Sequence, residues 1–320
     1  MSTRGVAGGE PTSRNATLGR RIALALAVAA SLATGVIAVV PSPALAAPEK
    51  CPDILLLGAR GSGERASAVG GLGPTVGKLA GQIEERLDTD AVSRLAVAYE
   101  AAGVETLVPS RAQAGLFARS IFGPASPELK ARRAAAVAAS FKIQRLGGYT
   151  ASIDEGVRGA QEQLTTFQAK CPDTSYILAG FSQGAMVMHQ TLLRLADAGD
   201  DDTLGKIIAT VLIADGDRVK DTTATQVGSA PSAARGVRSV FSVNERDSKP
   251  EPDMVVYDVC VEGDLVCDFS LLRIVRPSAS QTMAAVNRSA TIHTSTYKDR
   301  NNPLLAEVAD AIARQEGRRD

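Results

Sequence analysis

A serine flanked by glycines, Gly180-Phe-Ser-Gln-Gly184, stands between a short apolar run and a segment with helical spacing. The run at 176–179 has the composition of a buried strand, and apolar residues recur along 185–196 as on one face of a helix. A Gly-x-Ser-x-Gly motif in this context predicts a sharp strand-to-helix turn that holds the serine hydroxyl above a sheet. The glycines are needed because side chains there would collide with the neighbouring strand and helix. Since the motif alone often arises by chance, its flanking elements carry the prediction that Ser182 is a nucleophile.

The rest of the chain alternates short apolar runs with longer helical patterns, as a parallel sheet with crossover helices requires. Strands are predicted at 54–57, 95–99, 176–179, 207–213 and 237–243, and helices at 72–87, 149–170, 185–196 and 304–313. Two stretches interrupt this alternation. The first is a proline-containing and then basic segment at 108–146, and the second is an irregular loop at 222–236, rich in Ser, Thr, Ala and Gly, which begins an insertion at about 222–253. We therefore predict a single α/β domain, a three-layer sandwich around a central, mainly parallel sheet.

The N-terminal segment predicts export. Basic residues up to Arg21 precede an uncharged apolar run at 22–40, and two prolines then lead to Ala44-Leu-Ala46. This order is typical of a signal peptide that is cleaved after about Ala46, which leaves residues 47–320 as the mature domain. A retained membrane anchor is the alternative, because the run is nearly long enough to span a bilayer. We expect a secreted protein, either extracellular or in the cell envelope.

Because an exported protein enters an oxidising compartment, its cysteine content bears on whether disulfides form. The mature chain holds four cysteines, an even number in an oxidising compartment, and three pairings are open to them. Cys260 and Cys267 are close enough in sequence to close one loop, which leaves Cys51 with Cys171. A metal site is the alternative, but the chain has no Cys-x-x-Cys pair and only two histidines. We expect two disulfides and no metal.

Serine is a weak nucleophile at neutral pH and needs a neighbouring base. His189 and His293 are the two histidines of the chain. His189 follows Ser182 by seven residues on the same predicted helix, about 10.5 Å along its axis, too far to reach it. It is therefore interpreted as a packed or surface helix residue. His293 is predicted to be the base, in a loop that follows the last strand and folds over the site.

A third residue should orient the imidazole and stabilise its charged form. Asp264 is the best candidate, because it lies inside the short loop Cys260-Val-Glu-Gly-Asp-Leu-Val-Cys267, where a disulfide would hold a carboxylate still. Its competitors are interpreted as solvated turn residues; they are Asp215, Asp258 and Asp268. The order Ser182, Asp264, His293 along the chain is the one that α/β-hydrolases use.

These motifs together resemble the cutinase family, and its exported actinobacterial members most closely. They occur in family order over about residues 50–300, as Cys51-Pro-Asp, Ala59-Arg-Gly-Ser-Gly-Glu64, Cys171-Pro-Asp, Gly180-Phe-Ser-Gln-Gly-Ala185, Cys260-x-x-Gly-Asp-x-Val-Cys267 and His293. One departure concerns a tyrosine that often follows the family's histidine by three residues. Here Tyr297 follows His293 by four, which leaves the geometry of the histidine segment open.

The resemblance implies an α/β-hydrolase fold with a Ser182–His293–Asp264 triad and disulfides Cys51–Cys171 and Cys260–Cys267. It also implies an oxyanion hole formed by the backbone N–H groups of Ser62 and Gln183, assisted by the Ser62 hydroxyl. A plain turn residue is the alternative interpretation of Ser62.

The function that the resemblance implies is hydrolysis of carboxylic esters through an acyl-enzyme, without a cofactor. Short- to medium-chain acyl esters are the default substrates, and cutin-like polyesters, triglycerides, phospholipids and mycolyl glycolipids are compatible with such a site. A cell-envelope acyltransferase with the same triad is the alternative, and a non-catalytic envelope protein that kept only the fold is a third hypothesis.

The formal net charge and its distribution limit which molecules the protein is expected to bind. Thirty-five basic and thirty-five acidic residues give a formal net charge of zero, which argues against nucleic acid or an anionic membrane as the main partner, since either would favour an excess of basic residues. The basic, alanine-rich helix from Lys130 to Lys142 is consistent with a cap over the pocket, a surface for lipid headgroups or a solvated helix face. We expect a monomer that meets an ester or lipid substrate, with transient contact to a lipid surface.

Overall fold

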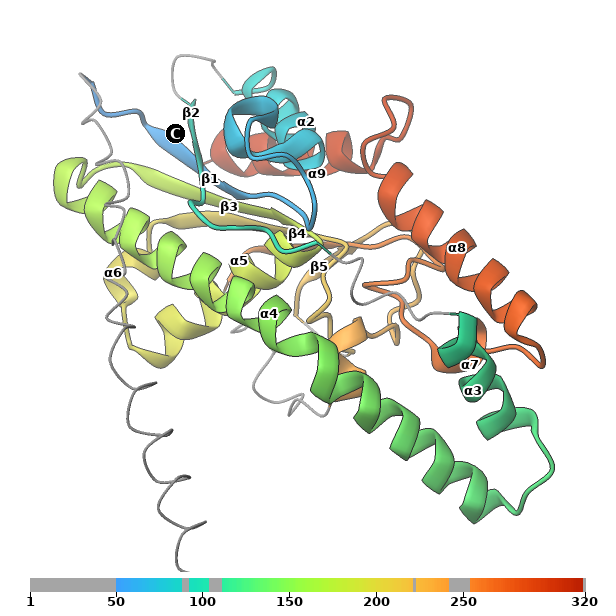
Figure 1. Ribbon diagram of the computed structural model, residues 1–320. Helices are drawn as coiled ribbons and strands as arrows, with labels where there is room; N and C mark the ends of the chain where they lie inside the picture. The colour runs from blue at the N-terminus through green and yellow to red at the C-terminus, as the bar shows by residue number, and fades with distance from the viewer. Residues whose placement is uncertain (1–49, 88–91, 104–110, 221–222, 242–253, 319–320) are drawn as a thin grey trace, which may run out of the picture. The chain divides into compact units, whose positions relative to one another are not determined.

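A computed structural model describes residues 50–87, 92–103, 111–220, 223–241 and 254–318 of the chain (Figure 1). The predicted signal peptide at 1–46 lies outside these residues, as do parts of the segments 108–146 and 222–253. No helix within the described ranges is both long and apolar enough to cross a lipid bilayer.

The described part of the chain is built on a six-stranded sheet in the order β2-β1-β3-β4-β6-β5, in which every neighbouring pair is parallel. Its strands are β1 (Ile54–Ala59), β2 (Val92–Ala96), β3 (Ser175–Phe181), β4 (Ile207–Ile213), β5 (Thr225–Val227) and β6 (Val256–Val259). The residues of β1, β4 and β6 are buried almost without exception, because a parallel sheet is covered on both faces. The predicted parallel α/β architecture is confirmed.

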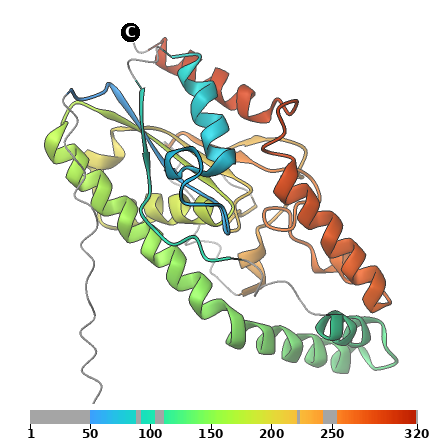
Figure 2. The same ribbon diagram turned by 45° about the horizontal axis from the view of Figure 1, so that its top comes forward.

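Two layers of helices complete the sandwich (Figures 1 and 2). Helices α2 (Gly73–Glu84) and α9 (Leu304–Glu316) cover one face and pack on Ile54 and Leu56 of β1. Helices α4 (Pro127–Lys170) and α5 (Gln183–Asp197) cover the other face. Alternate residues of a strand point to opposite faces, so Leu55 and Leu57 pack under this second layer.

The predicted strand at 237–243 is wrong. Val237–Phe241 forms a short 3-10 helix, η3, and residues 242–243 lie outside the described ranges. The amides of Val237 and Arg238 bond to the carbonyls of Val266 and Gly216, so this run is tied to loops instead of to a strand. The sheet is completed by β6 and by β5, which lies in the segment expected to be irregular. The predicted strand at 95–99 also begins earlier, at Val92.

Helix α4 joins two predicted helices, because the basic helix expected at 130–142 and the helix expected at 149–170 form one uninterrupted helix. It begins after Ser126, whose side chain accepts a hydrogen bond from the Leu129 amide, with Pro127 in the first turn. Its N-terminal half and α3 (Arg111–Phe122) form a helical hairpin, and α3 also packs against α8 (Ala279–Ser295). Figures 1 and 2 both show this hairpin beyond the edge of the sheet.

The four cysteines form the two expected disulfides. Cys51–Cys171 joins the segment before β1 to the residue that follows α4, and encloses most of the first half of the domain. Cys260–Cys267 closes a loop of a few residues directly after β6. The second bridge therefore acts on a single loop at the carboxyl end of the sheet, where a parallel α/β fold places its ligand sites.

Candidate active site

Ser182 lies between β3 and α5, with φ 56° and ψ −116°. This positive φ is strained for a residue with a side chain, and such strain is held in place only by its surroundings. A Cβ atom on Gly180 would lie 2.2 Å from the Gly184 carbonyl oxygen, and one on Gly184 would lie 2.1 Å from the Ala59 carbonyl oxygen. Both flanking glycines are therefore required by the close approach of backbone, as the sequence predicted.

The imidazole of His293 lies between Ser182 and Asp264. Its Nε2 is 2.9 Å from the Ser182 Oγ, and its Nδ1 is 3.0 Å from each carboxylate oxygen of Asp264. The ring of Phe181 stacks on it, with centroids 5.1 Å apart. Three residues that are distant in sequence thus form one continuous hydrogen-bonded chain.

His293 belongs to the last turns of helix α8, and the prediction of a loop at this position was wrong. The helix begins at Ala279, after Ser278 caps its first turn by accepting a hydrogen bond from the Gln281 amide. Tyr297 lies just beyond the last helical residue, Ser295, in the turn that follows the helix. The Tyr297 hydroxyl donates a 2.8 Å hydrogen bond to Asp264, the carboxylate that His293 contacts.

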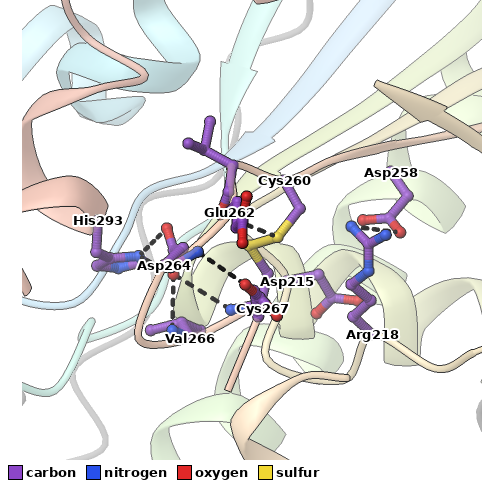
Figure 3. The surroundings of a disulfide bond; sticks show 12 residues. Asp215, Arg218, Asp258, Cys260, Glu262, Asp264, Val266, Cys267 and His293 are labelled. Carbon is purple, nitrogen blue, oxygen red and sulfur yellow. Dashed lines mark hydrogen bonds and ion pairs between the residues drawn. A yellow bond between two sulfur atoms is a disulfide. The ribbon is translucent and has the colours of Figure 1, made fainter. Parts of the chain in front are cut away.

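Asp264 is fully buried in the loop that the Cys260–Cys267 disulfide closes (Figure 3). Besides its bonds to His293 and Tyr297, its Oδ1 accepts hydrogen bonds from the amides of Val266 at 2.7 Å and Cys267 at 3.2 Å. Burial alone would raise the pKa of Asp264. The charge and hydrogen bond of His293, together with these other donors, instead hold that pKa below its ordinary value. The carboxylate is therefore kept ionised where it can stabilise an imidazolium.

The Gln183 amide is at the first position of α5, where a helix leaves its N–H groups without intrahelical partners. Ser62 lies in the loop after β1, and its hydroxyl oxygen is buried. It is near enough to the Tyr149 hydroxyl to offset part of the rise in pKa that burial imposes on that tyrosine. The loop that carries Ser62 approaches the start of α5, since a Cβ atom on Gly184 would lie 2.5 Å from the Arg60 carbonyl oxygen, and this position favours the oxyanion-hole interpretation of Ser62 over that of a plain turn residue.

The loop that carries Ser62 is held by residues whose role the sequence did not reveal. Glu64 accepts a 2.8 Å hydrogen bond from the Gly61 amide, and the Arg60 Nε donates to the Glu64 carbonyl at 3.1 Å. Arg60 also donates to the Tyr99 carbonyl at 2.6 Å and lies over the Tyr99 ring. Burial raises the pKa of Glu64. The family motif contained Arg60 and Glu64, but only the fold shows that they brace the loop.

The competing carboxylates are buried, so their interpretation as solvated turn residues is wrong. Asp215 is 1% exposed and its Oδ2 is 2.6 Å from the Nδ1 of His189, a buried core residue. Asp258 belongs to β6 and pairs with Arg218 at 3.1 Å. Asp268 accepts a 2.7 Å bond from the Gly263 amide. The contacts of Asp215 and Asp258 had no signal in the sequence, because their partners come from other elements.

The sequence matches a family model described as Cutinase over residues 118–291, which is more than half of the chain. The fold is also similar to that of a cutinase-like protein from Cryptococcus sp., at 19% identity and a TM-score of 0.45, over 77% of this chain and 97% of that one. The catalytic core domain of acetyl xylan esterase from Trichoderma reesei matches at 19% identity and a TM-score of 0.42, over 75% and 100%. Lysin B from Mycobacteriophage D29 matches at 13% identity and 0.44, over 85% and 100%.

Proposed function

Because the chain belongs to the cutinase family and is a carboxylic ester hydrolase, we propose that it is a secreted serine esterase with Ser182 as nucleophile. The observation that carries this proposal is the position of the His293 ring. Its Nε2 is 2.9 Å from the Ser182 Oγ, while its Nδ1 is 3.0 Å from Asp264 on the opposite side. A general base that is bonded both to a nucleophile and to a buried carboxylate is the arrangement that activates serine.

In the first half of the reaction, the Ser182 Oγ attacks the carbonyl carbon of the ester while the Nε2 of His293 accepts the hydroxyl proton. Negative charge develops on the carbonyl oxygen, and the backbone N–H groups of Gln183 and Ser62 donate to it, together with the Ser62 hydroxyl. Asp264 stabilises the imidazolium that forms. His293 then passes the proton to the departing alcohol oxygen, which leaves an acyl group on Ser182.

In the second half, a water molecule replaces the alcohol. His293 accepts a proton from this water as its oxygen attacks the acyl carbon, and the same donors hold the oxyanion. The bond to Ser182 then breaks, its Oγ recovers the proton from His293, and the carboxylic acid leaves. The residues that this cycle needs are all supplied by the chain, and each returns to its starting protonation state.

Two observations support secretion. Both disulfides persist only where thiols are not kept reduced, and they use every cysteine in the sequence. The second observation is the N-terminal order of basic, apolar and small residues, which is typical of an export signal.

Acyl chain length is the property that narrows the substrate class most. Rates of hydrolysis of a series of esters from acetate to palmitate measure this preference directly.

The test is hydrolysis of a soluble p-nitrophenyl ester by the mature protein and its Ser182→Ala variant. We expect the variant to lose at least about four orders of magnitude in kcat, because the nucleophile cannot be replaced by neighbouring groups. Ser289→Ala, one turn before His293 on α8, is the matched control and should keep full activity. Near-normal hydrolysis by a folded Ser182→Ala variant would refute the proposal.

A further inference from the structure

The α3–α4 hairpin exposes an unusual set of apolar side chains. Four large hydrophobic residues are strongly exposed within the described ranges, and three of them are on this hairpin. Leu116 and Phe122 of α3 are each 48% exposed, and Leu129 in the first turn of α4 is 41% exposed. Such residues are rarely gathered on one projecting element of a soluble enzyme unless they meet another surface.

The same hairpin concentrates positive charge. Residues 111–133 include five basic residues and a single acidic one, in a chain whose formal net charge is zero. The side chains of Arg119, Arg132 and Arg133 are exposed, and that of Lys130 is partly exposed. Apolar side chains beside long cationic ones match the chemistry of an anionic lipid surface, where the apolar groups enter the acyl boundary and the cations contact the headgroups.

The hairpin is connected to the site through helix α8. Gly115 of α3 lies against the N-terminal end of α8, since a Cβ atom there would be 3.6 Å from the Cβ of Ala279. His293 lies near the other end of the same helix, about 21 Å away at the usual rise per residue. A lipid surface bound by the hairpin would thus lie about one helix length from the triad. The hairpin itself does not form part of the triad.

We propose that residues 111–133, which comprise α3 and the first turns of α4 in the α3–α4 hairpin, dock the enzyme on a lipid surface that carries anionic headgroups. Of the three interpretations that the sequence left open for the basic helix, this one alone uses both the cations and the exposed apolar residues. The consequence for the substrate, an ester presented at such a surface, rests on the proposed esterase function. Docking itself does not depend on catalysis.

The test is co-sedimentation of the mature protein with vesicles. One set is made of phosphatidylcholine alone, and the other of equal parts phosphatidylcholine and phosphatidylglycerol. We expect binding to the anionic vesicles only. Arg132→Gln/Arg133→Gln should weaken it about thirtyfold, from the loss of two cations near the surface. Phe122→Ser/Leu129→Ser should weaken it to a similar degree, because it removes the apolar contacts.

Matched controls come from outside the hairpin. Val69→Ser removes an apolar side chain that is 47% exposed, and Arg158→Gln/Arg300→Gln removes two exposed cations, one of them on the sheet-covering half of α4. Both variants should bind anionic vesicles as the wild type does. All variants should hydrolyse the soluble ester normally, and Ser182→Ala should still bind vesicles, which separates docking from catalysis.

Four results would overturn the proposal. The first is failure of the wild type to bind anionic vesicles, and the second is equal binding by the hairpin variants. The third is self-association of the wild type that Phe122→Ser/Leu129→Ser abolishes while vesicle binding is absent, which would make the hairpin an interface between copies of this chain. Loss of soluble-ester hydrolysis in the hairpin variants would also contradict it, because it would make the hairpin part of the site.

Discussion

At the scale of single residues, the polar interactions of the site converge on Asp264. Its carboxylate accepts hydrogen bonds from the imidazole of His293, the hydroxyl of Tyr297 and two backbone amides. A buried charge is tolerated only when such donors replace its hydration. Because the same carboxylate oxygens hold the Nδ1 side of His293, the donors that keep Asp264 ionised also fix the imidazole toward Ser182.

The depressed pKa of Asp264 has a consequence for stability in acid. A carboxyl group whose folded pKa is below its ordinary value of 3.8 adds stability above that value, and loses it as the pH falls through the folded pKa. Urea unfolding of the wild type should therefore show a free energy that declines as pH falls below about 4. In Asp264→Asn this part of the decline should be missing, whereas Asp173→Asn, at an exposed position, should keep it. Equal pH dependence in the wild type and Asp264→Asn would contradict this account of the carboxylate.

At the scale of elements, the two disulfides have separate tasks. Cys51–Cys171 closes the long segment that runs from just before β1 to just before β3, while Cys260–Cys267 closes only the loop that carries Asp264. A long closed loop restricts the unfolded chain more than a short one does. The short bridge instead acts on local geometry, because the amide of Cys267 itself bonds to Asp264.

Replacing both cysteines of one disulfide by serine should show which bridge affects stability and which affects catalysis. Cys51→Ser/Cys171→Ser should lower the free energy of unfolding by about 5 kcal/mol and leave kcat of the folded enzyme near normal. Cys260→Ser/Cys267→Ser should cost less stability, about 2.5 kcal/mol, but lower kcat at least tenfold as the Asp264 loop loosens. Denaturant titrations and ester kinetics at low temperature measure both. A kcat unchanged by removal of the short bridge would contradict its role in holding Asp264.

The sequence was informative where a local pattern decides the structure. The strand of β4 at 207–213 was predicted with its observed bounds, since a short apolar run rich in β-branched residues is typical of a buried strand. Strand β6 was missed because Asp258 interrupts its apolar pattern, and the partner that makes this burial tolerable, Arg218, is supplied by a different segment. The loop predicted around His293 is helical for a similar reason, because its packing against α3 is not visible in the sequence.

At the scale of the whole molecule, a buried charged cluster ties the sheet to its surrounding segments. Figure 3 shows Arg218 reaching toward Asp258 of β6, with Asp215 close by. Both members of the Arg218–Asp258 pair are almost completely buried. Burial raises the pKa of Asp258 to about 7, although the Arg218 charge opposes this rise. The pair therefore joins two segments that are about 40 residues apart, with a protonation state that depends on pH.

Removing one partner of this pair should be costly, because it leaves the other charge buried without compensation. Arg218→Met alone should lower the free energy of unfolding by about 3–5 kcal/mol, and Arg218→Met/Asp258→Leu should recover most of that loss. The folded pKa of Asp258 is raised, so its contribution to stability is full below its ordinary value of 3.8 and is lost as pH rises through about 7. Urea unfolding from pH 4 to 8 should show this decline in the wild type and not in the double variant. An Arg218→Met variant as stable as the wild type would refute the structural role of the pair.

The central claim is that Ser182 is activated by His293 and Asp264, and covalent labelling tests it most directly. A fluorophosphonate probe followed by intact-mass and peptide analysis should find one adduct per folded chain, on Ser182. Labelling should slow strongly in Asp264→Asn and vanish in Ser182→Ala. A folded wild-type protein that takes up no probe, or an adduct that survives Ser182→Ala, would contradict the claim.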